Sequence, residues 1–106
     1  MAKFLSQATY TTEGLKGLLK EGGSARRKAL DKMAASLGGK VESLYFAFGK
    51  TDAFIVFDVP DNATAAAVSM IANATGTAKT ELTVLLTPEE IDAAVKKSAD
   101  YRPPGR

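Results

Sequence analysis

The stretch VESLYFAFGKTDAFIVFDVP, residues 41–60, decides the fold of this chain. Its two apolar segments, 41–48 and 53–59, flank the polar tetrapeptide Gly49-Lys50-Thr51-Asp52. Strand-forming residues on both sides of a short glycine-containing segment are typical of a β-hairpin. We therefore predict two antiparallel strands joined by a tight turn, and we expect every helix to pack against the sheet that they begin.

The segments before the hairpin read as one strand and a helical region. Lys3–Thr9 is predicted as a strand, and residues 12–37 as helical with a threonine N-cap. Gly22-Gly23 interrupts the helical pattern and Ser24 offers a second N-cap, so the sequence allows one bent helix or two. The apolar positions of this region are Leu15, Leu18, Leu19, Leu30, Met33, Ala34 and Leu37.

The segments after the hairpin are predicted as a helix, a strand and a second helix. Ala63–Ala74 is an alanine-rich helix with Val68, Ile71 and Ala72 as its predicted buried stripe, and Lys79–Leu86 is a fourth strand. Thr87-Pro88-Glu89-Glu90 is a capping box with proline at the first helical position, and it opens a helix that runs to about residue 98.

The predicted order is therefore β-α-β-β-α-β followed by a short helix. This order is typical of the ferredoxin-like α+β fold, in which an antiparallel four-stranded sheet carries two helices on one face. We expect a single domain over residues 1–98 and a proline-rich basic tail over residues 99–106.

Composition excludes several kinds of chemistry. The 106 residues contain no Cys and no His, so disulfides, thiolate nucleophiles and His-based metal sites or triads are ruled out, and we expect no metal and no cofactor. No apolar run is long enough to span a membrane, and no signal-peptide core precedes the first strand, so we expect a soluble cytoplasmic protein. The net charge of +2 combines +3 in residues 96–106 with −1 elsewhere, which argues against a nucleic-acid partner.

Both faces of the predicted sheet carry apolar residues. In residues 53–59 one face holds Ala53, Ile55, Phe57 and Val59, and the other holds Phe54, Val56 and Asp58. In residues 41–48 the two sets are Leu44, Phe46, Phe48 and Val41, Ser43, Tyr45, Ala47. Two helices cover only one face, and an apolar face left in water is unusual in a monomer. We expect a second copy to cover it about a two-fold axis, the alternative being that the last helix or the tail folds back over it.

Four short segments follow one another along the chain: Tyr10-Thr11-Thr12-Glu13-Gly14, Leu37-Gly38-Gly39-Lys40-Val41, the hairpin tetrapeptide and Pro60-Asp61. Their order and spacing resemble those of the GYD-domain family of small bacterial proteins. The hairpin tetrapeptide resembles the family's Gly-x-Tyr-Asp signature, with Thr51 in place of the tyrosine. The resemblance covers roughly residues 3–90 and implies a dimeric α+β barrel, in which two ferredoxin-like subunits pair through their sheets. Fold relatives include cofactor-poor enzymes, but a fold does not define an activity.

Five residues are predicted to contact a ligand. Asp52 is a carboxylate at the sheet edge, which can act as a base or bond its own turn, and Thr51 occupies the signature position. Asp58 alternates onto the second sheet face, where it needs a partner or solvent. Tyr10 and Tyr45 carry hydroxyl groups that can hold a substrate oxygen or satisfy a bond within the fold.

A possible anion site follows the double glycine. Ser24, Arg26 and Arg27 stand at a predicted helix start, where backbone N–H groups attract anions. The spacing matches no phosphate-binding loop, so a helix break with a solvated basic turn is the alternative.

The sequence favours a homo-oligomeric protein that binds a small molecule in a cavity between sheet and helices. The alternative is a cofactor-independent enzyme, isomerase- or monooxygenase-like, that uses Asp52 or Asp58 with Tyr10 or Tyr45. A third possibility, an RNA-binding domain, rests on a partial match of residues 50–57 to an RNA-recognition strand, in which Asp52 replaces a stacking aromatic.

Overall fold

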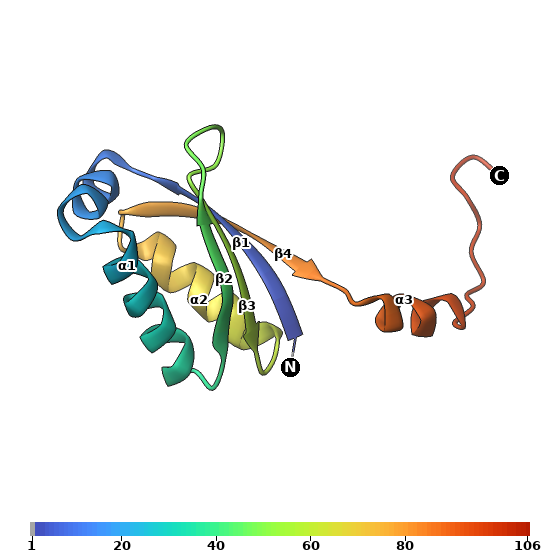
Figure 1. The fold of residues 1–106 in the computed structure, drawn as a ribbon. Coiled ribbons are helices and arrows are strands. Elements are labelled where there is room, and N and C mark those ends of the chain that lie inside the picture. Colours follow the sequence, from blue (N-terminus) through green and yellow to red (C-terminus); the bar gives the residue numbers. More distant parts are fainter. Residues whose placement is uncertain (1) are drawn as a thin grey trace.

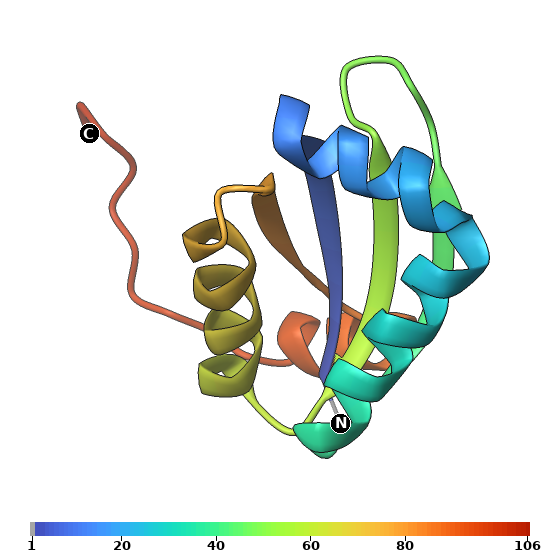
Figure 2. The same ribbon diagram turned by 90° about the vertical axis from the view of Figure 1, so that its left-hand side faces the viewer.

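A computed structural model describes residues 2–106 and shows a ferredoxin-like α+β fold (Figure 1). The elements in chain order are β1 (Ala2–Tyr10), α1 (Thr12–Ser36), β2 (Lys40–Phe46), β3 (Ala53–Val59), α2 (Asn62–Ala74), β4 (Ala78–Leu85) and α3 (Pro88–Val95). The four strands form one antiparallel sheet in the order β2-β3-β1-β4. Helices α1 and α2 lie on the same face of it, α1 mainly against β2 and α2 mainly against β4 (Figure 2). The predicted fold class is confirmed.

Helix α1 is bent at the predicted double glycine. The Thr11 side chain caps its start by accepting a hydrogen bond from the Gly14 N–H. Gly22 has φ 82° and ψ 171°, a non-helical conformation with the positive φ that favours glycine, so two helical arms meet at this residue. The second arm carries the buried Ala34. Leu19, one of the apolar positions on the first arm, is 79% exposed.

The core lies between the helices and the centre of the sheet. Phe4 of β1 faces Phe57 of β3 in the sheet register, and their rings stack with centroids 5.9 Å apart. Val59 and Ala65 are fully buried beside them. The small side chain of Ala65 lets α2 lie close to the strands, as its alanine-rich sequence indicates.

The strand alternation follows the prediction in β3 but not throughout β2. Ala53, Phe57 and Val59 are buried on the helix side, and Phe54 and Val56 lie on the opposite face, which we call the open face. A register shift between Val41 and Ser43 places Val41 opposite Phe57, on the helix side. The expectation that Val41 shares a face with Ser43 and Tyr45 is therefore wrong, because a bulge adds one residue to β2.

The segment after β4 does not pack against the hairpin. The Thr87 and Glu90 side chains form the predicted capping box, so α3 begins where its sequence predicts. No residue of α3 is buried, and Val95 is 77% exposed. The helix projects away from the body, on the side of the sheet opposite to α1 and α2 (Figures 1 and 2). The expectation that every helix packs on the sheet is wrong for α3, because β4 carries it beyond the sheet before it starts.

Candidate functional site

A cavity of about 220 Å³ lies between the sheet and the two helices, and its lining is mainly apolar. Side chains from α1, α2 and all four strands contribute to it. The larger apolar residues in the lining are Leu30, Met33, Val41, Ile55, Phe57, Val59, Val68 and Ile71. An apolar space of this size exceeds the roughly 150 Å³ engineered cavity in another protein that binds benzene. Its size suits a small organic molecule.

Small residues on β1 make room for the cavity. Phe4, Ser6 and Ala8 alternate along the helix side of β1 and are buried, and Tyr10 follows them. Ser6 and Ala8 line the cavity where larger side chains would fill it. Ser6 was not predicted as a site residue, although its alternation with Phe4 and Ala8 could have placed it on the helix side of the strand.

Six polar residues line the cavity: Ser6, Tyr10, Arg26, Thr75, Thr77 and Thr80. Tyr10, Arg26 and Thr77 lie together at one part of the wall, since all three also line a neighbouring depression. Tyr10 is half-buried, and burial raises the pKa of its hydroxyl, while the positive charge of Arg26 opposes that rise. The phenol therefore stays protonated well above neutral pH and is available as a hydrogen-bond donor.

The guanidinium group of Arg26 has few hydrogen-bond acceptors among the described residues. Its Nη1 lies 3.5 Å from Oε1 of Glu21, and its Nε is buried without an acceptor in residues 2–106. Glu21 does not line this cavity but a smaller depression of about 130 Å³, whose wall also includes Tyr10 and Arg26. Arg26 thus stands between the two spaces.

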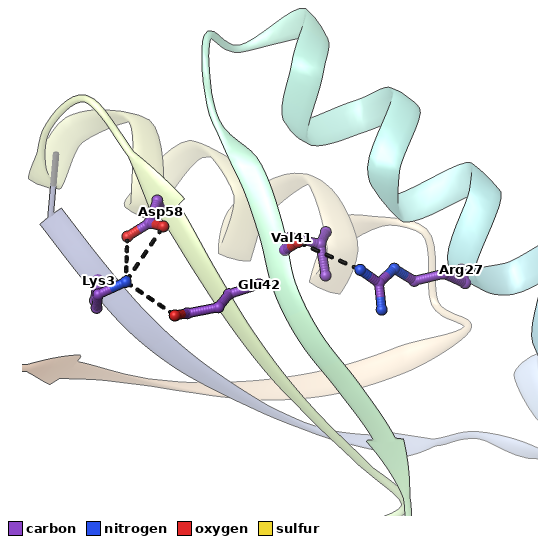
Figure 3. A network of polar contacts seen from close by, with 5 residues as sticks. All are labelled: Lys3, Arg27, Val41, Glu42 and Asp58. Carbon is purple, nitrogen blue, oxygen red and sulfur yellow. Dashed lines mark hydrogen bonds and ion pairs between the residues drawn. The ribbon is translucent and has the colours of Figure 1, made fainter.

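The three residues of the predicted anion site do not converge. Arg26 lines the cavity, whereas Arg27 donates from Nε to Oδ1 of Asp31 over 3.0 Å. Arg27 also donates from Nη2 to the Val41 carbonyl over 3.4 Å (Figure 3). Ser24 is exposed on the second arm of α1. The structure therefore brings only Arg26 into contact with the cavity.

Asp52 and Thr51 lie in the loop between β2 and β3, and neither lines the cavity. Oδ2 of Asp52 accepts a hydrogen bond from the Tyr10 backbone N–H over 2.9 Å. The Thr51 hydroxyl donates to Oε1 of Gln7 over 3.4 Å. Asp52 therefore touches the cavity wall indirectly, through the backbone of Tyr10.

Tyr45 and Asp58 lie on the open face instead. Tyr45 is 72% exposed, whereas Asp58 is only 5% exposed and forms an ion pair with Lys3 over 3.2 Å. Lys3 also binds Glu42 over 3.0 Å, so one ammonium group joins two carboxylates (Figure 3). Hydrogen bonds to Glu42 and then to Asp58 raise the pKa of Lys3. This ion cluster joins β1, β2 and β3 across the open face.

The described residues, 2–106, contain neither a candidate metal centre nor a candidate membrane-spanning helix. No group of three or more His, Cys, Asp or Glu residues in this range is placed to hold a metal ion. None of the helices in this range has both the length and the apolar character needed to cross a membrane.

The fold and the cavity define a class of protein: a ferredoxin-like α+β domain with an apolar pocket between its sheet and its helices. Within that class the chain belongs to the GYD-domain family, because the family model for the GYD domain matches residues 4–95. The resemblance inferred from the short motifs is confirmed. Neither curated proteins nor solved structures give a match to this chain.

Proposed function

We propose that this protein is a homo-oligomer that binds a small organic molecule in the cavity between its sheet and its helices. The observation that carries the proposal is the cavity itself, which is mainly apolar and has a few polar groups at one part of its wall. Small-molecule sites commonly combine these two features. A bacterial cytoplasmic setting, expected from the sequence, belongs to the same proposal.

The open face supports the oligomeric part of the proposal. Leu5 and Val56 are paired neighbours on it, and Phe54 is paired with the exposed Tyr45. The last helix leaves these residues uncovered, since it projects away from the body (Figure 1). A second copy seated on the open face would bury this row and would also lie on the side toward which α3 projects.

An ion cluster lies at one end of this row, and its charges are compatible with the pairing of two copies. Lys3, Glu42 and Asp58 satisfy one another within a single subunit, so they require no partner from the second copy. The apolar row then supplies the driving force, and the ion cluster lies at one end of it.

A cofactor-independent enzyme on the same scaffold is the second candidate. The observation in its favour is the Tyr10 phenol, which lines the cavity, stays protonated at neutral pH and can donate a hydrogen bond to a substrate oxygen. Asp58 and Tyr45 are remote from such a substrate, because they lie on the open face.

The oligomeric part is tested by light scattering after size exclusion. The Phe54→Glu variant places a charge in the apolar row of the open face, and we expect it to shift the protein to a single subunit. Met70→Glu is the matched control, because Met70 is also exposed but lies on α2. A wild-type protein that runs as a single subunit at all concentrations contradicts the oligomer and leaves the open face free for the RNA-binding alternative.

A further inference from the structure

Arg26 has more hydrogen-bond donors than the protein satisfies. A guanidinium group carries five N–H donors and no acceptor. In residues 2–106 its recorded partner is Glu21, at 3.5 Å from Nη1. This separation is longer than the roughly 2.7–2.9 Å of a charge-assisted hydrogen bond. The Arg26 side chain is 35% exposed as a whole, but its Nε is buried without an acceptor in this range, so a ligand or water has to complete it.

The unsatisfied edge of the guanidinium group matches one chemical group well. Glu21 contacts Nη1, the nitrogen on the side of Cδ, which leaves Nε and Nη2 without a recorded acceptor among the described residues. These two nitrogens present parallel N–H groups, the arrangement that binds both oxygens of a carboxylate.

The charge of the cavity limits the ligand to a single negative charge. Arg26 is the one charged residue among the described lining residues, and Tyr10 beside it is neutral at physiological pH. A phosphate dianion would need further cations, and Arg27 does not supply one, since it is held by Asp31. The rest of the wall is uncharged and mainly apolar, which suits a hydrocarbon body.

We propose that the cavity takes a small apolar carboxylate, with its carboxylate group bound by Arg26 and its hydrocarbon part packed against Ile55, Phe57 and Val68. This inference rests on the proposed function, because it requires the cavity to be a ligand site. The hydroxyl groups of Tyr10 and Ser6, which also line the cavity, are available as further donors to the carboxylate.

The test compares a charged probe with its neutral isostere. Titration calorimetry on the full chain with phenylacetate and with phenylacetamide should show phenylacetate binding roughly tenfold tighter or better. The carboxylate offers a charge and two acceptor oxygens to the paired N–H groups, whereas the amide is neutral and has one oxygen and an NH₂ donor. The preference should fall with ionic strength. Equal binding of the two probes overturns the carboxylate proposal but leaves the cavity as a ligand site.

Variants of Arg26, Arg27 and Ala72 test whether the Arg26 side chain causes the preference for phenylacetate and whether both probes bind in the cavity. Arg26→Gln should lose the preference for phenylacetate and keep the binding of phenylacetamide, while the neighbouring control Arg27→Gln should keep both. Ala72→Leu adds volume to the cavity wall and should weaken both probes. Binding of neither probe to the wild-type protein removes the proposed function together with this inference, whereas a preference that survives in Arg26→Gln overturns the role of Arg26 alone. Should Arg26→Gln fail to fold, Arg26→Lys keeps the charge but removes the paired donors, and it should reduce the preference.

Discussion

The backbone N–H of Tyr10 donates a hydrogen bond to Oδ2 of Asp52 over 2.9 Å. The Asp52 N–H in turn donates to the Ala8 carbonyl over 2.9 Å, and its carbonyl accepts from the Ala47 N–H over 2.8 Å. One residue of the hairpin loop therefore holds the end of β1 as well as the end of β2. Because Tyr10 lines the cavity, Asp52 positions the polar part of the cavity wall without touching a ligand.

Replacing Asp52 should reveal this positioning role. Asp52→Ala leaves the Tyr10 N–H without its acceptor and should lower the free energy of unfolding by about 1–3 kcal/mol. Asp52→Asn keeps an oxygen acceptor and should lose less. Urea unfolding at one fixed protein concentration measures both, since oligomers gain stability with concentration. Equal unfolding free energies of the alanine variant and the wild-type protein would show that this hydrogen bond does not stabilise the fold.

Two glycines of α1 should respond in opposite directions to alanine. A methyl group at Gly14 would overlap the carbonyl oxygen of Thr77, which is itself fixed by the Thr11 N–H over 3.0 Å. We expect Gly14→Ala to lower the unfolding free energy by about 1–3 kcal/mol, the usual cost of overpacking. Gly17 has open space around it, so Gly17→Ala should raise that energy by about 0.5–1 kcal/mol. Thermal unfolding followed by circular dichroism compares them, and destabilisation by both would mean that helix propensity does not decide the result at Gly17.

Local signals predicted the order of the elements well. The hairpin, the break at Gly22 and the capping box at Thr87 are each set by a few neighbouring residues, so they can be read from the sequence. The bulge after Val41 could not be read, because it depends on how β2 pairs with β3. The exposure of α3 was also missed, since an apolar stripe such as Ile91 and Val95 does not say which surface it meets.

The candidate site was predicted only in part. Tyr10 and Arg26 were each singled out, but for different sites, and only the folded chain brings both to one cavity. Ser6 was missed because a small polar residue in a strand usually marks no site. Asp58 was placed on the correct face, but its partner Lys3 comes from a strand far away in the sequence, and pairing of that kind is tertiary information.

The ion cluster of the open face predicts a loss of stability in alkali. Hydrogen bonds to Glu42 and then to Asp58 raise the pKa of Lys3 in the folded protein above its ordinary value of 10.5. The stabilisation is therefore complete below the ordinary lysine pKa and disappears as the pH rises through the raised value. Lys3→Met removes this contribution at every pH, so the stability difference between wild type and variant should be largest near neutrality and shrink above about pH 10.5.

Urea unfolding of both proteins between neutral and strongly alkaline pH measures this difference. Ionisation of Tyr10 occurs in the same alkaline range, but both proteins contain Tyr10 and its effect cancels in the comparison. A difference that does not change with pH would mean that Lys3 acts through its packing and not through its charge.

The projecting C-terminal segment should matter for assembly and not for the subunit. Residues 88–106 are exposed, so deletion of residues 87–106 should change the unfolding free energy of the single subunit by less than about 0.5 kcal/mol. This unfolding free energy is measured in the Phe54→Glu variant, which is expected to be monomeric.

In the otherwise wild-type chain the same deletion should weaken self-association about tenfold or more, because burial of a side chain such as Ile91 or Val95 against a partner contributes about 1.5–3 kcal/mol. Sedimentation equilibrium gives the dissociation constant. The double variant Ile91→Ser, Val95→Ser should reproduce the effect and Lys96→Ser, Lys97→Ser should not; an unchanged constant in the deletion would show that α3 does not reach the second copy.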